Sequence, residues 1–186
     1  MDGQRLRGLC LCPMTLRRAT LDDLPFLLDL EQRFRDLGFI GGDDAHTHAR
    51  QVADPDCLYW IVEEKSERAG YVVLLGLKSI NRCIELKRIV IAEPERGLGR
   101  IVLRAIIDKA FSELSAHRLW QDVYDDNHRA RHVYRSLGFI EEGILRECIQ
   151  CEGRFRSLVV MSMLESEYRQ SVTGAQAPAA FRRGAR

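Results

Sequence analysis

The feature that most constrains the fold is a strand-to-helix junction in the middle of the chain. The segment 83–92, CIELKRIVIA, is rich in β-branched and apolar residues and predicts a strand. The segment 99–114, GRIVLRAIIDKAFSEL, has apolar residues at helical spacing and predicts a helix. Between them stands PERGLGR, residues 94–100, in which Gly97 and Gly99 are one residue apart. A strand that passes through a glycine turn into a helix is typical of an α/β fold.

This glycine turn has the chemistry of an anion site. The first N–H groups of a helix have no intrahelical acceptor, and the helix dipole favours negative charge there. Glycines in the turn let the backbone approach a phosphate, and Arg96 and Arg100 flank it. The turn lacks the Gly-Lys-Ser/Thr of a P-loop, and Val102 stands where a dinucleotide-binding motif has its third glycine. Many ligand-free proteins share such a turn, so its meaning depends on the neighbouring motifs.

The remaining elements alternate around this junction. Thr20 is expected to be the N-cap of an early helix, and Gly138 the C′ residue of a late one. Further strands are predicted at 14–19, 58–64, 70–78, 118–124, 145–150 and 156–164, and further helices at 20–35, 44–54 and 127–138. Because hairpin strands come first and a βαβα pattern later, we expect an α/β fold with a central mixed sheet flanked by helices.

The chain reads as one domain with two tails. Residues 1–13 are expected to form a flexible N-terminal tail, and residues 14–170 the folded domain. Residues 171–186 contain Ala, Gly and Arg without an apolar period and are expected to be disordered.

Charge and hydropathy exclude several classes of partner. The 28 basic and 27 acidic residues leave a formal charge of +1, so nucleic acid and anionic membrane surfaces are not expected as partners. No apolar run approaches the roughly 20 residues of a membrane span, and the N-terminus lacks the features of a secretion signal. The sequence therefore predicts a soluble cytoplasmic protein.

No metal site is expected. The six cysteines are scattered and read as reduced thiols, and Cys148-x-x-Cys151 has no matching second pair at zinc-site spacing. His128 and His132 are four residues apart on a helix, but no acidic or cysteine partner is placed to complete a metal site.

A second motif lies downstream of the glycine turn and helps to interpret it. In DDNHRARHVYRSLGFIEEG, residues 125–143, the side chains of Asn127, Ala130 and Tyr134 are three and four residues apart and share one helical face. Together with the glycine turn, this pattern closely resembles the GCN5-related N-acetyltransferase (GNAT) superfamily. The resemblance covers residues 15–168. The neighbouring sequences are similar to the branch that contains ribosomal-protein N-terminal acetyltransferases and small-molecule relatives.

The resemblance implies a binding site for acetyl-CoA as the acetyl donor. The glycine turn would hold the pyrophosphate, and Pro94 departs from the Gln or Arg usual at its first position. The strand before the turn would pair with the pantetheine arm, and the helix that carries Asn127 and Ala130 would line the other side of the cofactor. The implied cofactor-binding residues are Ile89, Val90, Ile91, Arg96, Gly97, Leu98, Gly99, Arg100, Asn127 and Ala130.

The resemblance also implies two proton-transfer residues. Tyr134 is expected to protonate the departing CoA thiolate, although a tyrosine that merely packs on the CoA wall is an alternative. The attacking amine must lose a proton, and Glu85 is expected to take it. Asp122 and a water chain are the alternatives, and Glu85 paired with Lys87 is the non-catalytic reading.

The expected function is acetyl transfer from acetyl-CoA to a primary amine by direct attack. The acceptor is a protein N-terminus or a small-molecule amine, and its pocket is expected around residues 38–48, where Asp43 and Asp44 either attract a cation or cap a helix. Homodimers are frequent in the family. The alternatives are a degenerate acyl-CoA-binding module and a protein-interaction module on the same scaffold.

Overall fold

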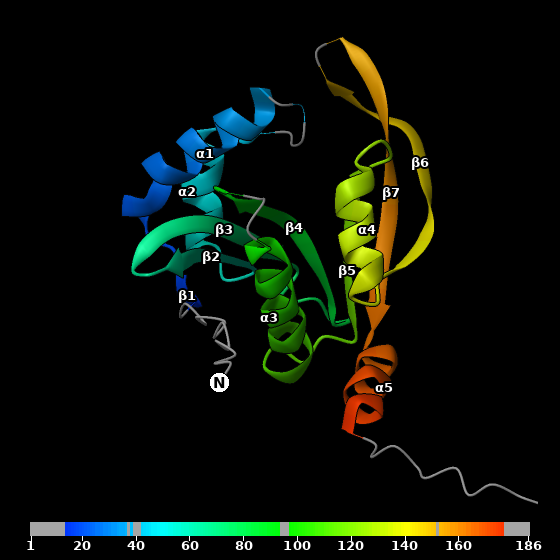
Figure 1. The fold of residues 1–186 in the computed structure, drawn as a ribbon. Helices are drawn as coiled ribbons and strands as arrows, with labels where there is room; N and C mark the ends of the chain where they lie inside the picture. The colour runs from blue at the N-terminus through cyan, green and yellow to red at the C-terminus, as the bar shows by residue number, and fades with distance from the viewer. Residues whose placement is uncertain (1–13, 37, 39–41, 94–96, 152, 177–186) are drawn as a thin grey trace, which may run out of the picture.

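A computed structural model describes residues 14–36, 38, 42–93, 97–151 and 153–176 of the chain. It contains one seven-stranded sheet in the order β1-β2-β3-β4-β5-β7-β6 (Figure 1). The strands are β1 (Met14–Arg18), β2 (Cys57–Glu64), β3 (Glu67–Leu75), β4 (Cys83–Ile91), β5 (Arg118–Tyr124), β6 (Ile140–Cys151) and β7 (Arg154–Leu164). The helices are η1 (Leu21–Asp23), α1 (Leu24–Asp36), α2 (Ala45–Ala53), α3 (Leu98–Ser112), α4 (His128–Ser136) and α5 (Glu165–Gln176).

The sheet is mixed, which confirms the expected fold class. Strands β1 to β4 pair antiparallel, β4 and β5 run parallel, and β5, β7 and β6 pair antiparallel. Parallel neighbours need a crossover, and helix α3 supplies it between β4 and β5. The expected strand, glycine turn and helix are therefore the parallel unit at the centre of the sheet.

Helices cover both faces of the sheet. Leu27 and Leu30 of α1 pack with Tyr71 and Val73 of β3, on the face that also carries α2. On the opposite face, α3 and α4 share a second apolar cluster with residues from β2 to β5 and β7. Figure 1 shows α3 and α4 side by side on that face. The alternation of side chains along each strand separates the two cores.

Local capping chemistry agrees with the sequence at three helix ends. The Thr20 backbone N–H donates to Asp23 Oδ2 at 2.9 Å before the first helix. The Asn127 side chain accepts from the Ala130 N–H at 3.1 Å at the start of α4. Gly138 follows α4 with φ of +103°, the conformation that favours glycine after a helix.

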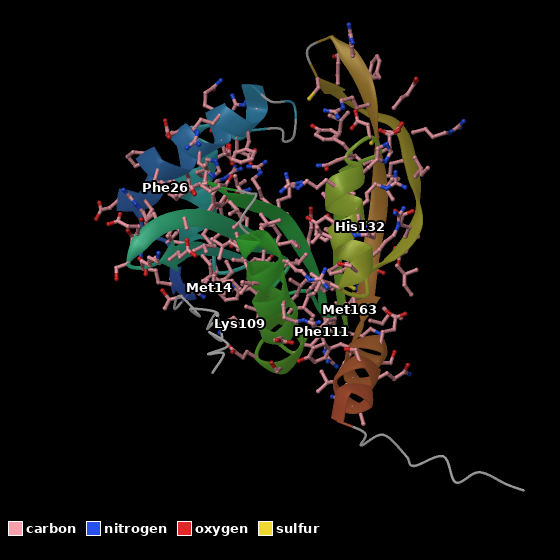
Figure 2. The ribbon with its side chains drawn as sticks, in the orientation of Figure 1. Met14, Phe26, Lys109, Phe111, His132 and Met163 are labelled. Atoms are coloured by element: carbon pink, nitrogen blue, oxygen red, sulfur yellow. The ribbon has the colours of Figure 1, made fainter. Side chains whose placement is uncertain are left out.

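The C-terminal end of the domain differs from the prediction. Helix α5 continues to Gln176, so the boundary expected at residue 170 is too early, and residues 171–176 are helical. The Leu164 N–H donates to Glu167 Oε2 at 2.8 Å and caps the helix. Phe111 of α3, labelled in Figure 2, stacks on Tyr168 with ring centroids 4.9 Å apart. This tertiary contact anchors a segment whose own sequence has little apolar period.

Two further expectations concern the start of strand β6 and the two tails. Strand β6 begins at Ile140, five residues before the predicted start at 145, because it pairs with β7 as far as Ser162. The tails 1–13 and 177–186 lie outside the described residues. No helix in the described part of the chain is long and apolar enough to cross a membrane.

Candidate active site

Strands β4 and β5 separate soon after they meet. Only Cys83, Ile84 and Glu85 pair with β5, and their partners are Arg118, Leu119 and Trp120. Beyond this point β4 continues to Ile91 and β5 continues to Tyr124, but the two strands no longer pair with each other. Figure 1 shows the two strands diverging upward from their meeting point. The split leaves backbone N–H and C=O groups of both strands without a strand partner on their facing sides.

A bulge lies on β4 just past the last pair. Val73 of β3 is opposite Arg88, but the next residue, Leu74, is opposite Leu86, so Lys87 is the extra residue. A bulge bends its strand and increases the local twist. The bend accounts for the divergence of β4 from β5, and it also changes which side chains of β4 face each side of the sheet.

A cavity of about 790 Å³ fills the split. Its walls come from α1, β4, the start of α3, β5, α4 and the β6–β7 hairpin, and therefore from both faces of the sheet. The lining residues are Phe34, Leu86, Lys87, Arg88, Ile89, Val90, Ile91, Gly97, Gly99, Arg100, Leu103, Gln121, Asp122, Val123, Tyr124, Asp126, Asn127, His128, Arg129, Ala130, Val133, Tyr134, Ile149 and Leu158.

The glycine turn borders this cavity at the start of α3. Gly97 is the N-cap, with φ of +75°. A Cβ added to Gly97 would meet nothing within 4 Å, and one added to Gly99 would meet only Ile91 Cγ1, at 3.7 Å. The two glycines therefore leave room for a ligand to approach the backbone at the start of the helix. Leu98 points away from it into the core, with 6% of its surface exposed.

Arg100 connects the two helices that flank the cavity. Its Nη1 donates to Ser136 Oγ of α4 at 2.7 Å, and the side chain lines the cavity. A guanidinium and helix N–H groups thus lie at the same end of the cavity, as an anionic ligand requires. Pro94 and Arg96 lie outside the described residues.

Helix α4 brings its motif residues to the opposite wall. Asn127, Ala130 and Tyr134 all line the cavity, as their shared helical face predicts. Tyr134 is buried and packs edge-to-face on Phe139, with centroids 5.6 Å apart. Burial raises the pKa of the Tyr134 phenol, and the Asp122 carboxylate raises it further. The phenol therefore stays protonated at neutral pH and is able to donate a proton.

The two candidate bases lie in different surroundings. Glu85 is in the last paired row of β4 and lies 3.4 Å from Lys87 Nζ, and it is not among the residues that line the cavity. Asp122 is half-buried on β5 and does line the cavity. Within the described residues, Asp122 has no hydrogen-bond or ion-pair partner. Its charge acts on Tyr134, since it raises the pKa of that phenol.

Sequence reasoning did not single out Gln121, which precedes Asp122. Only 1% of its surface is exposed, it lines the cavity, and its Nε2 has no hydrogen-bond partner within the described residues. The signal was present in RLWQDVY, because Gln121 takes the inward position between Leu119 and Val123. A polar residue at a core position of an alternating strand is worth testing as a ligand-binding group.

A buried ionic network, which sequence reasoning did not find, lies beside the cavity and shares Arg88 with its wall. Glu31 of α1 has no exposed side-chain surface and accepts from Tyr71 Oη and Arg88 Nη1. Arg88 lines the cavity and also pairs with Asp43 Oδ2 at 3.0 Å. His48 Nε2 lies 3.2 Å from Glu31 Oε1. Burial by itself raises the pKa of Glu31, but the contacts with His48, Arg88 and Tyr71 outweigh it and lower the pKa to about 2.

The two aspartates of the predicted acceptor region have separate roles. Asp43 belongs to this network, and its backbone N–H donates to Glu31 Oε2 at 3.1 Å. Asp44 is the N-cap of α2 and accepts from the Thr47 N–H at 2.7 Å. Neither residue lines the cavity.

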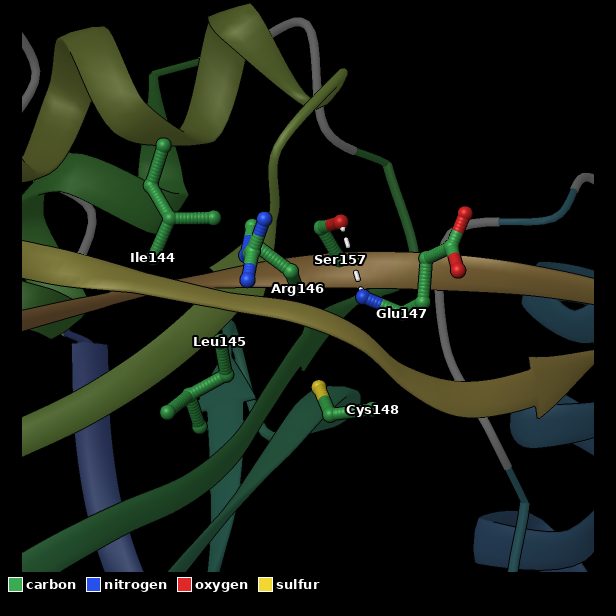
Figure 3. Close-up of a pocket in the computed structure, with 6 residues that line it drawn as sticks. All are labelled: Ile144, Leu145, Arg146, Glu147, Cys148 and Ser157. Atoms are coloured by element: carbon green, nitrogen blue, oxygen red, sulfur yellow. Dashed lines mark hydrogen bonds between the residues drawn. The ribbon is translucent and has the colours of Figure 1, made fainter.

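A second hollow, of about 770 Å³, lies on the β6–β7 hairpin (Figure 3). Its lining residues are Ile144, Leu145, Arg146, Glu147, Cys148 and Ser157, and all except Ser157 are exposed. The Glu147 N–H donates to Ser157 Oγ at 3.1 Å. The hollow lies where the β6–β7 register is irregular between Leu145 and Ile149, and no buried polar side chain lines it. It is a surface irregularity and not a candidate site.

The thiols and histidines do not converge. Cys57, Cys83, Cys148 and Cys151 are free thiols. His128 and His132 are exposed on α4. The described residues contain no group of three or more His, Cys, Asp or Glu side chains placed to hold a metal ion.

Known proteins share this architecture. The crystal structure of spermidine N-acetyltransferase from Vibrio cholerae, in complex with CoA and spermine, superposes with a TM-score of 0.75 and 26% identity. The superposition covers 84% of this chain and 98% of that one. Spermidine N(1)-acetyltransferase from Vibrio cholerae serotype O1 is 31% identical over 111 residues, 59% of this chain and 64% of that protein.

A putative ribosomal N-acetyltransferase from Bacillus subtilis is also 31% identical, over 120 residues. These cover 64% of this chain and 66% of that protein. The matched segments thus span somewhat less than two thirds of either of these two curated relatives. The sequence model of the acetyltransferase (GNAT) family matches residues 24–139, more than half of the chain and the whole segment from α1 to the end of the α4 motif. The split sheet, the glycine turn and the α4 motif are thus found together in a chain that belongs to the acetyltransferase (GNAT) family.

Proposed function

We propose that this protein is an N-acetyltransferase that transfers an acetyl group from acetyl-CoA to a primary amine. The observation that carries the proposal is the split between β4 and β5, because one cavity there brings together the N-terminus of α3, a protonated phenol and a carboxylate that has no partner among the described residues. The names of the relatives agree, since the Vibrio cholerae enzyme is a spermidine acetyltransferase and was crystallised with CoA.

The α3–α4 side of the cavity suits acetyl-CoA. The N–H groups at the start of α3, together with Arg100 and Arg96, would hold the pyrophosphate. The unpaired edge of β4 from Ile89 to Ile91 offers backbone groups to the amides of the pantetheine arm. Gly97 and Gly99 leave the approach open, because neither carries a side chain. Asn127 and Ala130 would form the opposite wall.

Two residues would move protons during transfer. An ordinary primary amine is mostly protonated near neutral pH and must lose a proton before it attacks. Asp122 is proposed to accept that proton, since it is the carboxylate inside the cavity without a partner in the described residues. Glu85 was the expected base, but its place in the paired part of β4 argues against that role. Tyr134 is proposed to donate its proton to the departing thiolate of CoA.

Negative charge develops on the thioester oxygen as the amine attacks. A backbone N–H near Ile91 on the unpaired edge of β4 is proposed to donate to that oxygen. Such a donor is held by the sheet and needs no rearrangement during the reaction. Direct attack is proposed because no cysteine is among the residues lining the cavity.

The acceptor is proposed to be a cationic amine, and a polyamine is the first compound to test. Asp122 and Asp126 both line the cavity, and Asp126 is held 2.5 Å from Arg156 Nη2. Asp122 is left to attract the substrate ammonium group before it takes the proton. A cytoplasmic location remains part of the proposal, because acetyl-CoA is a metabolite of the cell interior. A homodimer also remains part of it, because homodimers are frequent in the family.

The alternative is a module that binds acyl-CoA without catalysing transfer. The departure at Pro94 in the glycine turn favours it. Replacement of Tyr134 by Phe separates the two readings. An enzyme should lose about 10²- to 10⁴-fold in kcat and keep its affinity for acetyl-CoA, whereas a binding module should be unaffected.

The test begins with calorimetric titration of acetyl-CoA into the intact protein and into an Arg96→Glu, Gly97→Glu double variant. Release of free CoA is then followed with spermidine, spermine and peptides carrying a free N-terminus as acceptors. The proposal predicts binding that the double variant abolishes and transfer to at least one amine. If the intact protein binds acetyl-CoA but no amine accelerates CoA release, the binding-module reading replaces it.

A further inference from the structure

Gln121 carries a buried hydrogen-bond donor that has no partner within the described residues. Its surface is 1% exposed, and its Nε2 has no partner within the described residues. Buried amide groups are nearly always hydrogen-bonded, because loss of water without a replacement partner costs stability. Gln121 also lines the cavity in the split sheet. A buried donor that lacks a protein partner and lines a cavity is typical of a group that binds a ligand.

The place of Gln121 along β5 is equally specific. Trp120 is the last β5 residue that pairs with β4, so Gln121 is the first residue past the separation point. Its side chain is on the same face as Leu119 and Val123, which pack in the apolar cluster that includes Tyr134 of α4. Gln121 and Tyr134 therefore line the cavity from the same face of the sheet.

Within the described residues, no acceptor is hydrogen-bonded to the Gln121 amide nitrogen. The lining of the cavity includes Leu86, Leu103 and Val133, which are apolar. The neighbouring Asp122 side chain alternates to the opposite face, and no hydrogen bond joins it to Gln121 within the described residues. A structural role for the Nε2 group would require a partner, and the described residues supply none.

We propose that the Gln121 Nε2–H donates a hydrogen bond to the thioester carbonyl oxygen of bound acetyl-CoA. This inference rests on the proposed function. Tyr134 is proposed to act on the thioester sulfur, and the carbonyl oxygen is bonded to the carbon next to that sulfur. A donor on the same face as Tyr134, where β4 and β5 separate, is therefore proposed to meet the carbonyl, whereas the pantetheine amides would lie further along the arm toward the glycine turn.

The chemistry of the transfer makes use of such a donor. When the amine attacks, the carbonyl π bond opens and the oxygen gains negative charge, and this charge returns to the carbonyl as the C–S bond breaks. A neutral N–H held in a water-poor wall stabilises that charge more than a solvated group does. Gln121 would thus assist the proposed β4 backbone N–H and is a catalytic residue in the strict sense, since it contacts a reacting atom.

The test compares Gln121→Met with Gln150→Met. Methionine has a similar length to glutamine and no N–H donor in its side chain. Gln150 is exposed on β6 and does not line the cavity, so Gln150→Met makes the same change away from the site. The first measurement is the infrared carbonyl stretch of acetyl-CoA labelled with ¹³C at the carbonyl, free and bound. In the intact protein and in Gln150→Met the bound stretch should fall below its free value, and in Gln121→Met much of that decrease should disappear.

Binding and kinetics give the second and third readouts. Gln121→Met should bind CoA, which lacks the carbonyl, as tightly as the intact protein, and should lose its preference for acetyl-CoA over CoA. Its kcat should fall about 10²- to 10³-fold, as for removal of one oxyanion donor. Removal of an unsatisfied buried amide favours folding, so the variant is expected to fold, and circular dichroism verifies this. If Met is not tolerated, Gln121→Leu is used in the same comparison.

Two results would overturn the inference. One is an unchanged carbonyl stretch in Gln121→Met. The other is an equal loss of affinity for CoA and acetyl-CoA, which would place the amide against the pantetheine arm. Failure of the proposed function is a different outcome, since the intact protein itself would then show no acetyl-CoA binding or no transfer.

Discussion

The buried carboxylate of Glu31 provides a sharp test of how the cavity wall is held. Replacement by Gln removes the charge at the centre of the network but keeps the size of the side chain. Arg88 Nη1 would then retain Asp43 alone, and Tyr71 and His48 would lose the carboxylate that they contact. Loss of one partner from a buried ion pair costs about 3–5 kcal/mol, because the other charge stays buried.

A second route to the magnitude uses proton linkage. The pKa of Glu31 is lowered from 4.5 to about 2 in the folded protein. At about 1.4 kcal/mol per pKa unit, the carboxylate contributes about 3 kcal/mol to the free energy of unfolding. Because the folded pKa is the lower one, this contribution is fully present above about pH 4.5 and is lost as pH falls through about 2. The two routes agree.

The measurement is urea unfolding of the intact protein and of Glu31→Gln at several values between pH 7 and pH 3.5. The variant should be less stable by about 3 kcal/mol at pH 7, and the difference should shrink below about pH 4.5. Glu113→Gln is the matched control, since Glu113 is 59% exposed beside Lys109 and should change stability by less than about 0.5 kcal/mol. A difference under about 1 kcal/mol at pH 7, or one that does not vary with pH, would refute the reasoning.

Three further substitutions test the site and its support. Gly70→Ala would place a Cβ 2.3 Å from the backbone oxygen of Val90 beside the cavity, and thermal unfolding should show a loss of about 1–3 kcal/mol; Gly143→Ala, with nothing within 4 Å, should show almost none. Gly97→Ala meets no atom within 4 Å but must keep φ near +75°, so the free energy of unfolding should fall by about 1 kcal/mol in urea titrations. Asp122→Asn should lower kcat about 10²- to 10⁴-fold and leave the calorimetric affinity for acetyl-CoA unchanged, and full activity would exclude Asp122 as the base.

Local sequence was sufficient for the elements that carry the motifs. The helical spacing of Asn127, Ala130 and Tyr134 placed all three on the cavity wall, and Asn127 caps its helix as a short polar side chain should. The strand-to-helix junction with its glycine turn was likewise predicted from residue types and periodicity. These features depend on contacts within a few residues, and residue type alone is informative at that range.

Helix α5 and the surroundings of Glu85 were harder to predict. The segment from Ser171 has little apolar period, and the stacking of Phe111 on Tyr168 anchors the helix from a distant part of the chain. Glu85 was expected as the base from its position on β4. The bulge at Lys87 and the end of the β4–β5 ladder set its actual surroundings. Strand register is a long-range property, and one extra residue changes which way side chains point.

The sequence alone thus determined the order of strands and helices as far as β7, the mixed α/β class, the glycine turn and the face of α4 that carries Tyr134. Only the tertiary structure decided that β4 and β5 separate after Glu85, that Gln121 is buried with no partner for its Nε2 among the described residues, and that Glu31 contacts Arg88. The physical reason is the range of the interactions. Periodicity and capping act over one or two turns, whereas the split, the cavity and the buried charges arise where segments far apart in the chain pack together.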